Sequence, residues 1–229
     1  MRAGRRFRLG RIVCALYAVD VTYLTIDPDQ PSEQALRLAA SELSHGRVVA
    51  YPTDTLYGLA ADPRNADAVD CIYRLKGRTS VSPLSLIAAN IDQVNACVTE
   101  SSPLSCRLAE CFWPGPLTLI YDAGATLAPA MLAGGQTVAV RVPAHPVAAG
   151  IARVFCHPVT ATSANRSGGY PLSEASQITK ELPDGLSLIL DGGPTTGDLP
   201  STIIDARGSA PVLIRSGIVP WERVLQSLA

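Results

Sequence analysis

The sequence of 229 residues contains no hydrophobic run long enough to cross a membrane and no large excess of either charge. The longest uninterrupted apolar run near its start, residues 12–19, is far shorter than the roughly 20 residues that a transmembrane helix requires. Nineteen basic side chains stand against 20 acidic ones, which excludes binding of nucleic acid by a chain-wide positive charge but not by a local patch. We therefore expect a soluble globular protein without membrane contact.

Cysteine and histidine are not arranged as a metal site or a disulfide framework. No two of the six cysteines form a Cys-x-x-Cys pair, and the three histidines are scattered. Most cysteines stand among alanine, leucine and valine at helix-like positions, where a thiol behaves as a small hydrophobic side chain. We predict reduced core thiols, a cytoplasmic protein and no dedicated metal site.

The positive charge is concentrated at the start of the chain. Residues 1–19 contain five arginines and no acid, which leaves 14 basic and 20 acidic side chains in the remaining 210 residues, a net charge of −6. Such a leader is either an extension outside the fold or a targeting signal. In both cases we expect residues 1–20 to lie outside the fold and residues 21–229 to form one domain, long enough to bury a sizeable core.

Beyond the leader, short apolar runs alternate with amphipathic segments. Strands are expected at residues 47–51, 84–89, 117–121, 137–142, 158–162, 186–190, 201–206 and 211–215. Helices are expected within residues 32–46, 65–77, 102–113, 146–155, 174–182 and 221–228. This alternation predicts an α/β fold with a twisted mixed sheet, parallel and antiparallel, and flanking helices.

Standard nucleotide-binding and hydrolase motifs are absent. The sequence has no G-x-x-x-x-G-K-[ST], no G-x-G-x-x-G after a strand and no G-x-S-x-G. Polar clusters follow the predicted strands instead, at the edge where open α/β sheets place ligands.

Two of these clusters are rich in hydroxyl groups. Thr53, Asp54 and Thr55 follow a predicted strand, where they would either bind a small polar ligand or bond their own backbone in a turn. Ser163 and Asn165 follow another strand and precede two glycines, an arrangement that fits either a phosphate cradle or a plain turn.

Basic residues supply the other candidates. Lys76 and Arg78 flank a glycine at a predicted helix end, where they either cap the helix or bind a polyphosphate. The chain has 17 arginines and only two lysines, so a lysine at this position is unusual for the chain and favours polyphosphate binding over simple capping. Arg141 shares one side of an apolar strand with Thr137 and needs an anionic partner, either a structural carboxylate or a ligand. Ser201 and Arg215 belong to clusters that are weak when taken alone.

Taken together and in order, these segments resemble a known family. The segments Y-P-T-D-T-L-Y-G-L, K-G-R, P-G-P-L-T, V-A-V-R-V-P, T-S-A-N-x-S-G, P-S-T-I-I-D and I-R-S-G occur in the order found in the YrdC-like threonylcarbamoyl-AMP synthases, over roughly residues 23–219. The most specific part is Lys76-x-Arg78 combined with Ser163-x-Asn165. The chain looks like the single-domain form of this family.

The resemblance implies a reaction and a set of site residues. The reaction condenses L-threonine, bicarbonate and ATP to L-threonylcarbamoyladenylate with loss of pyrophosphate, and the product serves the threonylcarbamoyladenosine modification of tRNA. By resemblance, the ATP site comprises Lys76, Arg78, Thr137, Ser163, Asn165 and Arg215, of which Lys76, Arg78, Ser163 and Asn165 are expected to be catalytic. By resemblance, the threonine site comprises Thr53, Thr55, Arg141 and Ser201. Mg²⁺ is expected to arrive with ATP, since no carboxylate cage is apparent.

One departure and two alternatives remain open. Some longer relatives have a histidine where this chain has the apolar segment around Ile87, a departure that concerns one threonine contact, and short bacterial members are similarly apolar there. The first alternative is a YrdC-like paralogue that binds double-stranded RNA or tRNA without catalysis. The second is a carbamoyl-adenylate former of hydrogenase maturation, but the zinc-finger and acylphosphatase-like parts of such chains are absent here. Other tRNA threonylcarbamoylation proteins are the expected partners.

Overall fold

The computed structural model describes residues 21–77, 82–195 and 199–229, and within these ranges the strands form two hydrogen-bonded sheets. The first sheet comprises, in spatial order, β1 (Thr22–Thr25), β9 (Leu188–Asp191), β2 (Val49–Tyr51), β3 (Gly58–Ala60) and β8 (Thr162–Ser163). The second comprises β11 (Val212–Arg215), β10 (Thr202–Asp205), β5 (Leu117–Asp122), β6 (Thr137–Arg141), β4 (Leu86–Ile87) and β7 (Val159–Thr160). Both sheets contain parallel and antiparallel pairs, which confirms the predicted α/β class with mixed pairing.

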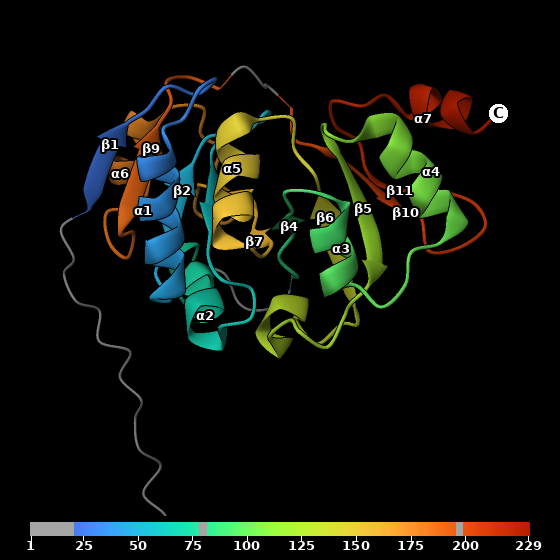
Figure 1. Cartoon of the computed structure of the whole chain (residues 1–229), viewed down its shortest axis with the longest axis horizontal. Helices are drawn as coiled ribbons and strands as arrows, with labels where there is room; N and C mark the ends of the chain where they lie inside the picture. The colour runs from blue at the N-terminus through green and yellow to red at the C-terminus, as the bar shows by residue number, and fades with distance from the viewer. Residues whose placement is uncertain (1–20, 78–81, 196–198) are drawn as a thin grey trace, which may run out of the picture.

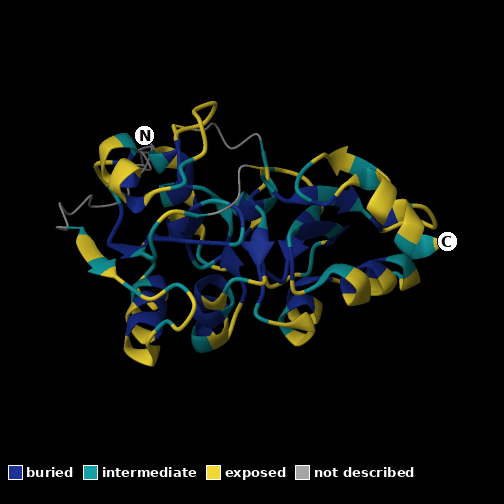
Figure 2. Cartoon of the chain, turned by 90° about the horizontal axis from the view of Figure 1, so that it is seen from above, coloured by how far each residue is buried: buried dark blue, intermediate teal, exposed yellow. Residues whose placement is uncertain are grey.

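Helices flank the sheets on both sides. They are α1 (Glu33–Ser44), α2 (Ala66–Leu75), α3 (Ile91–Cys97), α4 (Pro103–Phe112), α5 (Pro146–Phe155), α6 (Ala175–Glu181) and α7 (Trp221–Leu228), with a short 3-10 helix at Pro129–Leu132. Helices α1 and α5 lie side by side over the first sheet, and α4 and α7 pack together at the opposite end of the molecule (Figure 1). Figure 2 shows the buried strands as a central layer with the exposed surfaces of the helices turned outward.

Helix α1 illustrates how the local sequence specifies an element. Ser32 accepts a hydrogen bond from the Ala35 N–H at 3.3 Å and so caps the helix, as predicted. Leu36 lies on its buried side and packs closely against Gly150 of α5, where a Cβ atom would come within 2.8 Å of the leucine side chain. The absence of a side chain at Gly150 therefore allows the two helices to approach each other.

Strand β2 is buried on both sides, which explains its continuous apolar sequence. Val48, which precedes it, and Ala50 belong to one hydrophobic cluster, whereas Val49 and Tyr51 belong to a second cluster that includes α1 and α5. Alternate side chains of a strand point to opposite sides of its sheet. The first sheet is therefore covered by apolar side chains on both sides and lies at the centre of the core.

The predicted strand at residues 158–162 is divided between the two sheets. Val159 and Thr160 pair with β4 in the second sheet, whereas Thr162 and Ser163 pair with β3 in the first. The chain therefore passes from one sheet to the other at Ala161. Four elements were not predicted: β1, β3, α3 and the 3-10 helix at Pro129–Leu132. Each of them has at most seven residues, too few for a clear periodicity.

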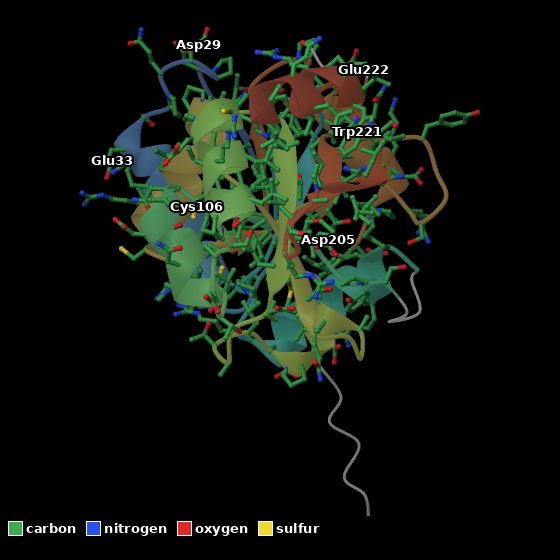
Figure 3. The ribbon with its side chains drawn as sticks, turned by 90° about the vertical axis from the view of Figure 1, so that its right-hand side faces the viewer. Asp29, Glu33, Cys106, Asp205, Trp221 and Glu222 are labelled. Atoms are coloured by element: carbon green, nitrogen blue, oxygen red, sulfur yellow. The ribbon has the colours of Figure 1, made fainter. Side chains whose placement is uncertain are left out.

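The prediction of core cysteines is confirmed for Cys97 alone among the described cysteines. Cys71 is half-buried, and Cys106, Cys111 and Cys156 are exposed. Cys106 lies on the outward side of α4 (Figure 3), whose buried residues are Ser105, Leu108 and Ala109. No helix in the described ranges is long and apolar enough to span a bilayer, and no group of metal-ligating side chains is found in them.

Candidate active site

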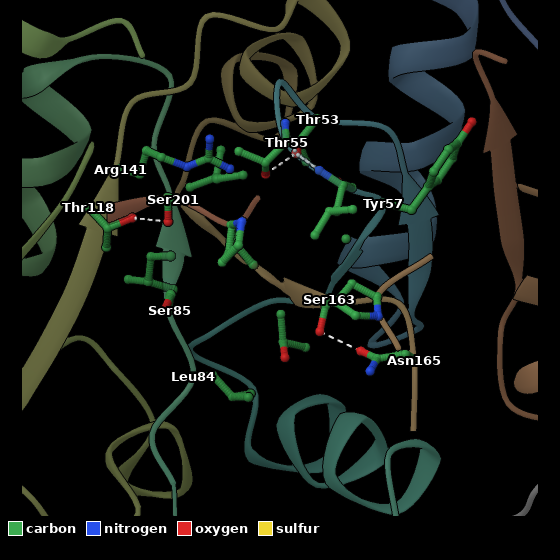
Figure 4. A pocket seen from close by; sticks show the side chains of 18 of the residues that line it. Thr53, Thr55, Tyr57, Leu84, Ser85, Thr118, Arg141, Ser163, Asn165 and Ser201 are labelled. Atoms are coloured by element: carbon green, nitrogen blue, oxygen red, sulfur yellow. Dashed lines mark hydrogen bonds between the residues drawn. The ribbon is translucent and has the colours of Figure 1, made fainter. Parts of the chain in front are cut away.

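A cavity of about 530 Å³ lies between the two sheets and is lined by residues from both (Figure 4). Three cationic side chains reach its surface, Lys76, Arg141 and Arg215. None of the described residues that line it is acidic. Hydroxyl and amide side chains occupy much of the remaining polar surface. Such a cavity suits an anionic ligand with several polar groups.

Lys76 joins the end of α2 to the segment that follows β8. It is only 3% exposed, and its ammonium donates to the carbonyl oxygens of Ser163 at 2.5 Å and Asn165 at 2.8 Å. The Ser163 hydroxyl donates to the Asn165 side-chain oxygen at 2.5 Å, and the Asn165 amide donates to the Gly169 carbonyl at 2.6 Å. Three residues singled out from the sequence thus form one network. Arg78, the fourth, lies outside the described residues.

The loop after β2 supports both of its alternative interpretations. The Thr53 hydroxyl accepts from the Thr55 N–H at 3.1 Å and donates to the Leu56 carbonyl at 2.7 Å, which makes the segment a hydroxyl-bonded turn. The Thr55 hydroxyl lies 2.9 Å from that of Thr53, and both side chains also line the cavity. The turn therefore bonds its own backbone while both threonines also line the cavity.

Arg141 has a structural carboxylate as its partner. Its Nη1 donates to Asp54 Oδ1 at 2.6 Å, with 7% of the arginine side chain and 15% of the aspartate side chain exposed. Ile87 lies opposite Arg141 in the register of β4 and β6 and is fully buried, although it too lines the cavity. Ile87 therefore contributes an apolar part of the cavity lining on the strand next to Arg141.

A second polar group lies at the ends of β5, β10 and β11. The hydroxyls of Thr118 and Ser201 are 2.8 Å apart, and Arg215 Nη2 donates to the Ser201 carbonyl at 2.8 Å and to its hydroxyl at 3.1 Å. Burial lowers the pKa of Arg215, and the neighbouring charge of Arg141 lowers it further. The two guanidinium groups therefore repel each other across a space where an anion would relieve the repulsion.

Sequence reasoning did not assign Thr118, although it quoted the P-G-P-L-T segment to which this residue belongs. A hydroxyl inside a buried strand was the available signal, because Thr118 is 3% exposed and needs a partner. Thr137, in contrast, is not among the described residues that line the cavity. It lies at the start of β6, opposite Asp122, whereas Arg141 lies at the end. The structure thus brings every described candidate to the cavity except two: Asp54, which contacts Arg141 but is not in the lining, and Thr137, whose assignment to the ATP site stays a prediction.

Comparisons with known proteins agree with this arrangement. The family model Sua5/YciO/YrdC, described as telomere recombination, matches residues 41–217. A threonylcarbamoyl-AMP synthase of Bacillus subtilis is 38% identical over 90% of this chain and 59% of its own length. That of Halorhodospira halophila is 40% identical over 76% of this chain and 92% of its own length. The crystal structure of Pyrococcus abyssi Sua5 complexed with L-threonine superposes with a TM-score of 0.87 and 33% identity, over 91% of this chain and 61% of that one.

The coverage differs between these relatives. The chain spans less than two thirds of the Bacillus and Pyrococcus proteins but nearly all of the Halorhodospira protein. Since the family model covers most of the chain and a relative at 40% identity is matched over almost its whole length, the chain belongs to the Sua5/YciO/YrdC family.

Proposed function

We propose that this chain is a threonylcarbamoyl-AMP synthase, a nucleotidyltransferase that forms L-threonylcarbamoyladenylate and pyrophosphate from L-threonine, bicarbonate and ATP. The observation that carries the proposal is the cavity with three cationic side chains and no described acidic residue in its lining. ATP, bicarbonate and the carboxylate of threonine are all anions. The names of the relatives support the same activity.

The chemistry requires positioning and charge neutralisation more than a reactive side chain. The amino group of threonine and bicarbonate combine to a carbamate with loss of water. A carbamate oxygen then attacks the α-phosphorus of ATP in line, and pyrophosphate leaves with the electron pair of the broken P–O bond. Holding the two reactants in alignment accounts for much of such an acceleration. We propose no covalent nucleophile.

We assign the binding of ATP and the binding of threonine to opposite ends of the cavity. We assign the ATP phosphates to the network of Lys76, Ser163 and Asn165, together with Arg78, whose placement the structure does not describe. We assign the threonine carboxylate to Arg141, at the opposite side of the cavity in Figure 4. The α-phosphorus would lie between the two ends, near the place where the carbamate forms.

The remaining polar residues complete the two ends. Thr53, Thr55 and Ser201 supply hydroxyl groups on the threonine side. Arg215, which we assign to ATP, adds positive charge where it contacts Ser201. Because the described lining has no carboxylate, its residues do not form a magnesium cage. We expect Mg²⁺ to enter with ATP, held by phosphate oxygens and water. We further propose a cytoplasmic protein that supplies the tRNA threonylcarbamoylation proteins.

The decisive experiment incubates the full chain with Mg²⁺, ATP, bicarbonate and labelled threonine. Adenylate and pyrophosphate should form only when all substrates are present. Serine lacks one methyl group, worth about 1 kcal/mol of discrimination, and should be a poor but detectable substrate. Equal pyrophosphate release without an amino acid would contradict the proposal. Binding of double-stranded RNA or tRNA without any adenylate would favour the non-catalytic alternative.

A further inference from the structure

The guanidinium of Arg141 forms an ion pair with Asp54, a residue that does not itself line the cavity. Asp54 contacts Arg141 at 2.6 Å, and it is absent from the lining residues, whereas its neighbours Thr53 and Thr55 both belong to them. The turn that presents two hydroxyl groups to the cavity therefore also anchors the arginine.

The ion pair leaves most of the guanidinium available. The guanidinium of Arg141 has five N–H groups, and the contact with Asp54 Oδ1 is the one hydrogen bond that this group makes to the described residues. Arg141 is nevertheless 6% exposed and reaches the cavity. An anion in the cavity can therefore bond to the N–H groups that Asp54 does not use, and a guanidinium edge suits the two oxygens of a carboxylate.

The loop geometry fixes Asp54 in turn. The Thr53 hydroxyl accepts from the N–H groups of Thr55 and Leu56 at 3.1 and 3.2 Å, so the backbone on the C-terminal side of Asp54 is tied down. Asp54 Oδ2 is buried and has no hydrogen-bond partner among the described residues. Among the described residues the carboxylate thus makes a single hydrogen bond, to Arg141, and leaving the other oxygen unpaired carries a free-energy cost.

We propose that Asp54 is a positioning residue, which holds Arg141 in the orientation that receives the carboxylate of the amino-acid substrate. This inference rests on the proposed function for the identity of that substrate. A long side chain that is already ordered loses less conformational freedom when it binds a ligand. The orientation of Arg141 is therefore set before threonine enters.

The negative charge of Asp54 also has an effect on threonine binding that opposes its role as an anchor, and this makes the inference testable. A carboxylate close to the binding site repels the carboxylate of threonine, so removal of its charge alone would strengthen binding. Loss of the anchor would weaken binding, because Arg141 would then be free to adopt other rotamers. The two accounts predict changes of opposite sign for Asp54→Asn, which retains the shape of the side chain.

The experiment titrates L-threonine into the full-length wild-type chain and into Asp54→Asn, and measures the threonine and ATP dependence of adenylate formation. The matched control is Asp62→Asn, since Asp62 is similarly buried (13% exposed) and pairs with Arg64 at 2.8 Å, but neither residue lines the cavity. We expect Asp54→Asn to raise the Kd and the KM for threonine about tenfold, the scale of one lost charge-assisted hydrogen bond. The KM for ATP and kcat should stay within about a factor of two of wild type, and the control should match wild type in all of them.

Each outcome has one meaning. If wild type binds threonine and Asp54→Asn binds it equally or more tightly, the inference is wrong and the proposed function stands. If wild type does not bind threonine at all, the proposed function itself fails. Should Asp54→Asn be too unstable to titrate, Asp54→Glu replaces it, because it keeps the charge but shifts the carboxylate by one methylene. The same loss of threonine affinity is expected, and unchanged affinity would overturn the inference.

Discussion

Replacing Lys76 by methionine distinguishes the two roles that the sequence allows for this lysine, capping of a helix and binding of a polyphosphate. Methionine preserves most of the buried stem and removes the ammonium group. The Ser163 carbonyl keeps a hydrogen bond from the Asn165 N–H at 2.9 Å, but no other described group donates to the Asn165 carbonyl. The substitution therefore removes the ammonium bonds between the end of α2 and the segment after β8 and leaves the Asn165 carbonyl oxygen unpaired, although the Ser167 N–H still donates to the Lys76 carbonyl at 2.9 Å.

The magnitude follows from these contacts. A hydrogen bond to a charged group contributes about 1.5–3 kcal/mol, and an unpaired buried carbonyl costs about 1–3 kcal/mol. Relief of the buried charge offsets part of this sum, so we expect a net loss of about 2–4 kcal/mol. At about 2–4 °C per kcal/mol for a domain of this size, the melting temperature should fall by about 4–16 °C. A lysine that only caps the helix contributes about 0.3–1 kcal/mol, or no more than about 4 °C.

Lys180 provides a matched control, because it is the only other lysine of the chain. It lies in the last turn of α6 and is exposed, so Lys180→Met removes little beyond a favourable charge at a helix end. Thermal unfolding is measured for both variants with and without ATP. Wild type and Lys180→Met should be stabilised by ATP, and Lys76→Met should not. Equal melting temperatures for the two variants, with equal stabilisation by ATP, would refute the network and the assignment of Lys76 to the phosphates.

Three other changes test separate parts of the fold and the site. Gly217→Ala would place a Cβ 2.2 Å from the Pro200 carbonyl oxygen and should lower both stability and activity, whereas Gly208→Ala, with open space around it, should do neither; thermal unfolding and adenylate assays of the pair decide this. Burial lowers the pKa of His145, and its Nδ1 accepts a hydrogen bond from the Val147 N–H in the first turn of α5. Protonation of the ring removes this bond, so the wild-type protein should lose stability as the pH falls below about 6.5. His145→Asn, which caps without titrating, should lose less between pH 7.5 and 5.5 in unfolding curves. Arg78→Ala should cut adenylate formation by about 10²–10³ with little change in melting temperature, and a loss of stability alone would favour a capping role.

Local signals in the sequence were sufficient for the helices and for much of the site. Ser32 and the apolar spacing of α1 specify a capped amphipathic helix without reference to the rest of the chain. The pairing of Lys76 with Ser163 and Asn165 was accessible because the family resemblance links segments that are far apart in the sequence. In each case the information lies either in a short segment or in a recognisable motif.

The division into two sheets could not be predicted, because it depends on pairing between distant segments. Residues 158–162 were predicted as one strand, and nothing within this segment indicates that Thr160 and Thr162 pair with different sheets. The partner of Arg141 was equally inaccessible. Asp54 precedes it by 87 residues, and the sequence showed only that a buried arginine needs an anion.

The passage between the sheets also explains why the two ends of the cavity keep their separation. Thr160 belongs to the second sheet, yet its hydroxyl accepts from the Ala61 N–H at 2.8 Å and donates to the Leu59 carbonyl at 3.0 Å in and beside the first. Its carbonyl in turn accepts from the Tyr51 hydroxyl at 3.2 Å. Arg141 lies in the second sheet and Ser163 in the first, so these bonds fix the distance between the proposed carboxylate and phosphate ends. An in-line attack tolerates little misalignment of the reacting groups. A site that acts by positioning its substrates therefore requires a rigid connection between the two sheets.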